Sequence, residues 1–125
     1  FAHVWTEAML VIGDRPLVAH NAAFDVGVVR RSCEEYELDA PDLAYLCTVQ
    51  LSRRTWPDLR AHKLPIVAEH VGAELDHHDA LSDAAACSRI LHACIDAAGV
   101  TGVDELVAHH GLAERRVVPA TATPA

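Results

Sequence analysis

Two short apolar runs, each followed by a helical pattern, constrain the fold of this chain more than any other feature. The first run covers residues 17–19 and the second covers residues 43–47. Both have the length and composition of a buried strand. Helical patterns follow almost at once, over about 22–37 and about 49–56. Strands that alternate with helices are typical of an α/β fold.

Two further helices are predicted from apolar spacing and from the residues that begin and end helices. Residues 1–12 carry an apolar stripe at helical spacing, and Gly13 gives the helix a stop. Pro65 suits the first turn of a short helix, which ends at Gly72. Between the short helices, residues 57–63 are polar and are expected to form a loop.

The longest helix is predicted over residues 80–98, because apolar residues recur at helical spacing until Gly99. Thr101 and Asp104 resemble a capping box for a last helix, which closes at Gly111. The chain is therefore expected to be rich in helix.

Two strands between helices do not make a stable sheet with covered edges. The first predicted helix also has nothing before Phe1 to cap it. We therefore expect sheet-forming sequence upstream of Phe1 in the parent protein, and an α/β fold that keeps only a short sheet. Residues 1–112 are expected to form this N-terminally incomplete domain, and residues 113–125 a flexible tail, since the tail lacks periodicity.

Composition narrows the possible partners and the cellular location. Ten basic and 18 acidic residues give a net charge of −8, which argues against a broad basic surface that grips duplex DNA. No apolar run approaches the ~20 residues of a membrane helix, so no membrane contact is expected. The four cysteines form no CxxC pair and lie in apolar settings, which indicates reduced core residues of a cytoplasmic protein (Cys33, Cys47, Cys87 and Cys94).

The segment His20-Asn21-Ala22-Ala23-Phe24-Asp25 stands where the first strand gives way to a helix. Asn21 is expected to be the N-cap of that helix, and Asp25 lies in its first turn. A carboxylate there projects beyond the carboxyl end of the strand, where α/β folds bind their ligands. The simpler alternative is that Asp25 only stabilises the start of the helix.

The segment His78-Asp79-Ala80-Leu81-Ser82-Asp83 opens the longest helix. His78 precedes the helix and Asp83 lies about one turn inside it, so a loop and a helix can bring an imidazole and a carboxylate to one point. Asp79 is the expected N-cap. The alternative is a surface histidine beside a solvated aspartate.

Together, HNAAFD and HDALSD resemble the second and third motifs of the DnaQ-like, DEDDh-type 3′→5′ exonucleases, the family of the epsilon proofreading subunit of DNA polymerase III. The resemblance covers about residues 1–98 and implies a ribonuclease H-like fold. It implies metal-dependent hydrolysis with two Mg²⁺ or Mn²⁺ ions, which take hard oxygen ligands. In this resemblance Asp25 and Asp83 are metal ligands, and His78 is the general base that takes a proton from the attacking water.

The resemblance also implies a substrate and partners. Phe24 is expected to pack under the site, while His20 and Asn21 border the terminal nucleotide, so these three residues are the expected substrate-binding set. The substrate is the 3′ end of single-stranded DNA or RNA, in proofreading or repair, and a DNA polymerase subunit is an expected partner.

The family's first motif, Asp-x-Glu, has no counterpart in this chain. We therefore expect the complete parent protein to be an exonuclease and this chain alone to be weak or inactive. The alternative is a non-catalytic ribonuclease H-like module that binds nucleic acid or a polymerase. An uncovered apolar sheet face predicts that the chain self-associates.

A group of basic residues surrounds the loop at 57–63, namely Arg53, Arg54, Arg60 and Lys63. These residues either contact the phosphates of an incoming strand or form a solvated charge cluster, and the pattern does not decide between the two. His62, within the loop, is expected to be an exposed polar residue.

Overall fold

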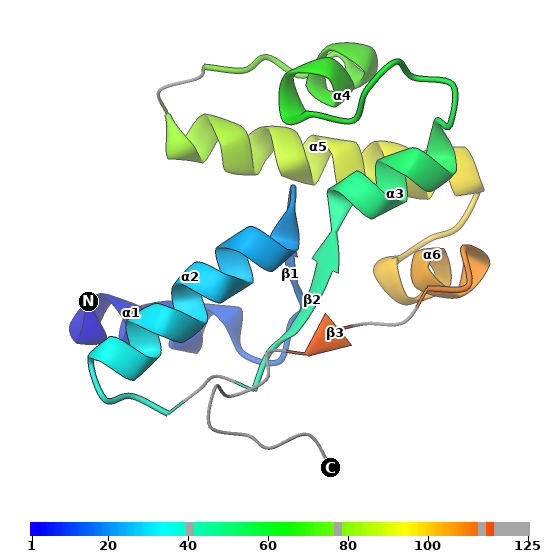
Figure 1. Ribbon diagram of the computed structural model, residues 1–125. Helices are drawn as coiled ribbons and strands as arrows, with labels where there is room; N and C mark the ends of the chain where they lie inside the picture. The colour runs from blue at the N-terminus through cyan, green and yellow to red at the C-terminus, as the bar shows by residue number, and fades with distance from the viewer. Residues whose placement is uncertain (40–41, 77–78, 113–114, 117–125) are drawn as a thin grey trace.

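The chain folds as a helix-rich α/β domain, which confirms the expected fold class (Figure 1). The computed structural model describes residues 1–39, 42–76, 79–112 and 115–116. In chain order the elements are α1 (Ala2–Ile12), β1 (Leu17–Ala19), α2 (Ala22–Glu35), β2 (Ala44–Cys47), α3 (Thr48–Thr55), α4 (Leu64–Val71), α5 (Ala80–Ala98), α6 (Val103–His109) and β3 (Arg115–Arg116).

Both expected strands form, and they run parallel, with Leu17 opposite Tyr45 and Ala19 opposite Cys47. The described residues add a third strand, β3, which pairs antiparallel with β2 and gives the order β1-β2-β3. The prediction of only two strands was therefore wrong. Backbone pairing with Ala44 and Tyr45 forms this two-residue strand, and so short a strand leaves no alternating pattern to read. The rest of the expected tail (113–114 and 117–125) lies outside the described residues.

The largest cluster of fully buried apolar side chains lies among the helices α3 to α6, and Leu46 of β2 is buried as well. Its fully buried members come from all four helices, and α5 packs against each of the other three (Leu51, Val67, Ile90, Cys94 and Leu106). The apolar spacing predicted for α4 and α5 accounts for this core, because it places one apolar face of each helix inward. In Figure 1 the strands lie below α5, with α2 on one side of them and α6 on the other.

The helix α1 forms as predicted, but its apolar side chains remain largely uncovered. Val4 is 66% exposed and Val11 is 75% exposed. At the start of the helix the ring of Phe1 stacks on Trp5 and on Tyr36, at centroid distances of 6.0 and 5.3 Å. The apolar stripe of α1 therefore has little to pack against in the described part of the chain.

The long helix α5 begins and ends as its sequence predicts. The Asp79 carboxylate accepts a hydrogen bond from the backbone N–H of Leu81 at 3.0 Å, so Asp79 is the N-cap. Gly99 follows the helix with a φ of 71°, a left-handed conformation that favours glycine.

The expected capping box before α6 pairs a different acid. Thr101 bonds to Glu105, through its backbone N–H at 3.1 Å and its hydroxyl at 2.8 Å, and not to Asp104. Gly102, rather than Thr101, is the N-cap, so the reciprocal acid lies one position further along. These two hydrogen bonds lower the pKa of Glu105.

No helix in the described ranges is long and apolar enough to cross a membrane. All four cysteines lie within those ranges and are free thiols. Three of them are buried, as expected of core residues, and Cys47 is half-buried.

Candidate active site

The parallel pairing of β1 and β2 brings two strand ends and two helix starts to one edge of the sheet. The helix α2 begins three residues after β1 ends, and α3 begins directly after β2. The helix α5 packs against β1, so its first turn is available at the same edge. This is the edge where α/β sheets bind their ligands.

Asp25 and Asp83 line one cavity of about 320 Å³ at this edge. Asp25 comes from the first turn of α2 and Asp83 from the first turn of α5, and His20 lines the same cavity. The structure thus brings together two of the three side chains that sequence reasoning assigned to catalysis. The third, His78, lies outside the described residues.

The electrostatics of the cavity suit a cation. Desolvation raises the pKa of Asp25, partly offset by a backbone hydrogen bond, and the residue remains exposed toward the cavity. Over the described residues neither Asp25 nor Asp83 forms an ion pair. Two carboxylates with uncompensated charge offer the hard oxygen donors that Mg²⁺ and Mn²⁺ prefer. Within the same residues, no group of three or more His, Cys, Asp or Glu side chains is placed to hold a metal ion.

His20 joins three parts of the site through its ring. Its Nε2 lies 2.6 Å from the backbone carbonyl of His62, and its Nδ1 lies 2.8 Å from Oγ1 of Thr48. A carbonyl only accepts hydrogen bonds, so Nε2 carries the proton and the neutral ring accepts the Thr48 hydroxyl at Nδ1. Burial lowers the pKa of His20, and the nearby His62 lowers it further, although the bond to the His62 carbonyl opposes both effects.

Thr48, Ser52 and His62 extend this network, and sequence reasoning missed all three. Thr48 and Ser52 are completely buried. The Ser52 hydroxyl donates to the Val49 carbonyl at 2.9 Å and lies 3.0 Å from Nδ1 of His62. His62 is half-buried, so the prediction of an exposed residue was wrong. One sequence signal could have indicated Thr48: it is a small polar residue directly after a predicted strand, at the position where α/β folds place functional groups.

Asn21 precedes α2 as predicted, but its side chain does not cap the helix. The backbone of Asn21 is in the left-handed conformation, with φ 70° and ψ 55°, whereas a residue that caps a helix through its side chain typically has an extended backbone. Its side chain instead lines a second cavity, which shares His20 with the first. The side-chain amide of Asn21 therefore lies at the site and forms no capping hydrogen bond with α2.

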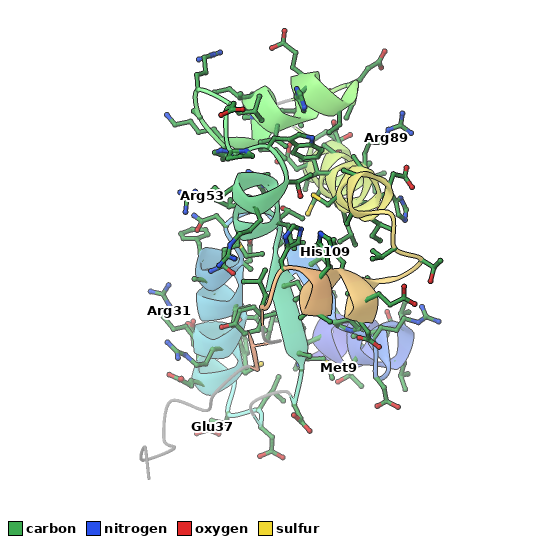
Figure 2. The ribbon with its side chains drawn as sticks, turned by 90° about the vertical axis from the view of Figure 1, so that its right-hand side faces the viewer. Met9, Arg31, Glu37, Arg53, Arg89 and His109 are labelled. Carbon is green, nitrogen blue, oxygen red and sulfur yellow. The ribbon has the colours of Figure 1, made fainter. Side chains whose placement is uncertain are left out.

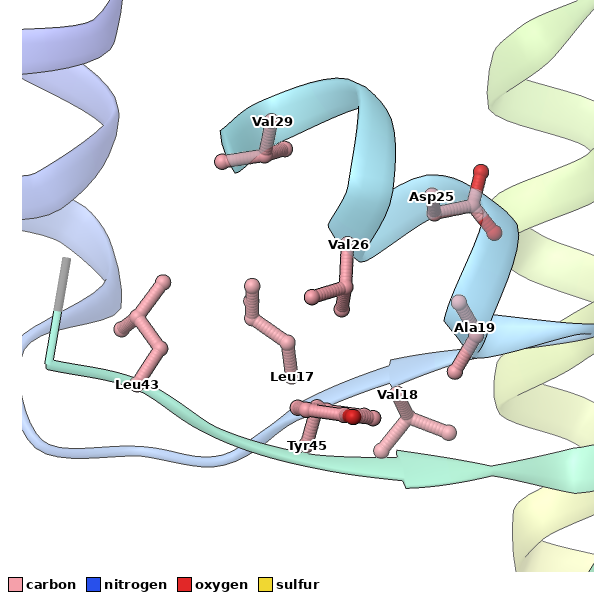
Figure 3. A pocket seen from close by; sticks show the side chains of 9 residues that line it. Leu17, Val18, Ala19, Asp25, Val26, Val29, Leu43 and Tyr45 are labelled. Carbon is pink, nitrogen blue, oxygen red and sulfur yellow. The ribbon is translucent and has the colours of Figure 1, made fainter. Parts of the chain in front are cut away.

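Phe24 does not pack under the site, because its side chain is 65% exposed. The face of α2 that meets the sheet carries Val26 and Val29, which line an apolar cavity of about 130 Å³ with Leu17 and Tyr45 (Figure 3). Figure 3 shows the carboxylate of Asp25 at the end of this helix nearest to α5, away from the valines. The helical period thus places Phe24 off the packed face and Asp25 at its edge.

This fold and this cavity define a class of protein: ribonuclease H-like α/β domains with paired carboxylates at the carboxyl ends of parallel strands. A family model described as an exonuclease matches residues 1–91. The chain therefore belongs to this exonuclease family, and the predicted resemblance to DnaQ-like exonucleases is confirmed.

Relatives carry the same segment within much longer proteins. The chain is 42% identical over 84 residues to a PolC-type DNA polymerase III of Clostridium perfringens, with 66% of this chain and 6% of the relative covered. It is 37% identical over 94 residues to a Mycobacterium tuberculosis protein named as a proposed bifunctional exonuclease/endonuclease. This match covers 73% of this chain and 15% of the relative. The chain thus spans a small part of the curated relatives it matches. The solved structures gave no significant match.

Proposed function

We propose that this chain supplies part of the active site of a DEDDh-type 3′→5′ exonuclease acting on single-stranded nucleic acid. The observation that carries the proposal is the meeting of Asp25 and Asp83 on one cavity at the carboxyl edge of the strands. Membership of the exonuclease family supports it. Residues 1–112 form the domain in this proposal, and residues 113–125 are its tail.

In the proposed reaction, a water oxygen attacks the terminal phosphorus, and the bond to the preceding nucleotide's 3′ oxygen breaks. His78 takes the proton of the attacking water, a role that suits an imidazole with an ordinary pKa near 6.5. Asp25 and Asp83 would hold Mg²⁺ or Mn²⁺, which when bound offsets the charge that develops on the attacking and leaving oxygens. Asn21 and His20 would border the terminal nucleotide. Phe24, being exposed, would have to contact the strand from outside the cavity.

We propose that the chain alone hydrolyses nucleic acid weakly or not at all. The described part of the chain contributes two carboxylates to the cavity, and no Asp-x-Glu occurs in the sequence. Two carboxylates offer two metal ions fewer oxygen ligands than four carboxylates do. They also balance less of the positive charge of the ions. In the parent protein we propose proofreading or repair beside a DNA polymerase, because the first relative is named as one.

A second candidate function is a non-catalytic module that binds nucleic acid or a polymerase. It is favoured by the same observation, that only two carboxylates of the described residues reach the cavity. Metal binding distinguishes the two candidate functions, because a non-catalytic module does not need two carboxylates that bind a metal ion.

The test is a titration of the chain with Mn²⁺ followed by calorimetry. We expect the wild-type chain to bind Mn²⁺ and an Asp25→Asn/Asp83→Asn variant to lose that binding. Asp96→Asn, which removes one charge from the exposed far end of α5, is the matched control and should bind as the wild type does. Equal binding by the wild-type chain and the double variant would refute the proposed site.

A nuclease assay on end-labelled single-stranded DNA and RNA with Mn²⁺ completes the test. We expect slow release of nucleotides at most, and only from the chain with both carboxylates. Rapid digestion by the purified chain would contradict the proposal that it is weak alone.

A further inference from the structure

A second cavity of about 620 Å³ adjoins the carboxylate cavity, and the two share His20 and Leu64 as common walls. Its lining includes Arg53 from α3, and His62 and Lys63 from the loop before α4. Among the described residues, the first cavity is lined by two carboxylates, whereas this one is lined by cations and by no carboxylate. The charge of the lining side chains therefore changes from negative to positive between the two cavities, with His20 on their common wall.

This local charge contrasts with the whole chain, whose net charge is −8. Neither Arg53 nor Lys63 forms an ion pair within the described residues, and both are exposed. Cations that line a cavity and have no ion-pair partner among the described residues are suited to an anionic ligand, even in a chain whose net charge is negative. Of the two interpretations that the sequence left open for the basic group, the cavity favours phosphate contact for these two residues.

The walls of this second cavity are held in place by partly buried hydrogen bonds. The His62 carbonyl accepts from His20, and the His62 ring bonds to the buried Ser52, which directly precedes Arg53 on α3. Lys63 follows His62, so both cations are attached to backbone that the network fixes. A site formed before its ligand arrives loses less conformational entropy on binding.

We propose, on the basis of the proposed function, that this second cavity holds the phosphate backbone of the strand next to its 3′-terminal nucleotide. The terminal nucleotide occupies the carboxylate cavity, and the strand leaves over His20 and Leu64 toward Arg53 and Lys63. The amide of Asn21, free of any capping role, lies along this path. The described residues of the lining include no Phe, Tyr or Trp side chain for base stacking, so in this proposal recognition rests on phosphates and accepts DNA and RNA alike.

The experiment measures binding of a fluorescein-labelled single-stranded oligothymidylate, about eight nucleotides long, by anisotropy at several salt concentrations. It is carried out in EDTA, so that no hydrolysis occurs and the result does not depend on the metal site. The variant is Arg53→Gln/Lys63→Gln. The matched control is Arg31→Gln/Arg89→Gln, which removes the same charge from positions away from Arg53 (Figure 2).

We expect the cavity variant to bind at least tenfold more weakly and its salt slope to fall by about 1.4, the value for two lost phosphate contacts on a single strand. The control variant should keep the wild-type slope. Equal weakening in both variants would overturn the proposal, because binding would then reflect total charge. Equally effective competition by inorganic phosphate, at the same phosphate concentration, would also overturn it and leave a simple anion site.

Failure here is distinguishable from failure of the proposed function. A chain that binds Mn²⁺ through Asp25 and Asp83 but binds no oligothymidylate refutes the strand path alone. A chain that binds the oligothymidylate through Arg53 and Lys63 but binds no Mn²⁺ refutes the metal site and supports the module that only binds nucleic acid.

Discussion

Replacing His20 by alanine tests the network that links the strand end to the loop before α4. The substitution removes two hydrogen bonds, to the His62 carbonyl and to Thr48, each with a net value of about 1 kcal/mol. Without the ring, the Thr48 hydroxyl is free to donate its proton to the Ala19 carbonyl, 3.3 Å away, so this buried group remains satisfied. The lost packing of the half-buried ring adds to the cost. We expect His20→Ala to lower the free energy of unfolding by about 2–3 kcal/mol.

The same substitution should change how stability depends on pH. The pKa of His20 is lowered in the folded chain, so the unfolded chain binds the proton first as pH falls. The stability contributed by neutral His20 is therefore complete above the unfolded pKa of about 6.5. It declines below that value until the folded pKa is reached, with each unit of separation worth about 1.4 kcal/mol. His110, whose pKa burial also lowers, adds the same trend to both proteins and cancels in their difference.

The assay is urea unfolding followed by circular dichroism, from about pH 7.5 to about pH 5.5. His92→Ala, on the exposed face of α5, is the control and should lie within about 0.5 kcal/mol of wild type. We expect the gap between wild type and His20→Ala to narrow as pH falls. A His20→Ala chain as stable as the control would refute the hydrogen-bonded role of this ring, and a gap independent of pH would contradict its lowered pKa.

Two further predictions concern the core and the uncovered helix. Ile90→Ala truncates a fully buried side chain at the centre of α5 and should lower the free energy of unfolding by about 2–5 kcal/mol. Ile90→Val should lower it by about 0.5–1.5 kcal/mol. Similar losses for the two variants in urea unfolding would contradict the close packing around Ile90. The exposed apolar side chains of α1 should make the chain self-associate, so its sedimentation coefficient should rise with concentration and Val4→Lys/Val11→Lys should reduce the rise. A monodisperse monomer at high concentration would count against this expectation.

The helices were predictable because their signals are local. Asp79 and Gly99 mark the two ends of α5, and the predicted range of 80–98 agrees with the structure. The spacing of apolar residues likewise placed α4 and its packed face. The short strand β3 was not predictable, because two consecutive arginines carry no strand pattern and the strand is defined by its backbone pairing with β2.

The site was predictable where a side chain projects from a strand end or a helix start, as Asp25 and Asp83 do. It was not predictable where the role depends on contacts between distant segments. His20 and His62 are 42 residues apart, and no spacing rule joins a ring nitrogen to a carbonyl in a distant loop. The prediction for Phe24 failed for another reason: the resemblance implied packing under the site, whereas the helical period leaves this side chain 65% exposed.

The position of Asp83 has a consequence for which substitutions would disturb the proposed metal site. Asp83 stands in the first turn of α5, the same helix whose middle carries Ile90 and Cys94 and packs on three others. A helix is stiff along its axis, so a cavity or a bulky side chain introduced near its centre tilts the carboxylate at its end. In a saturation mutagenesis screen for loss of the proposed metal binding, the harmful positions would therefore extend along α5 well beyond the cavity, and distance from the cavity would be a poor guide to their effect.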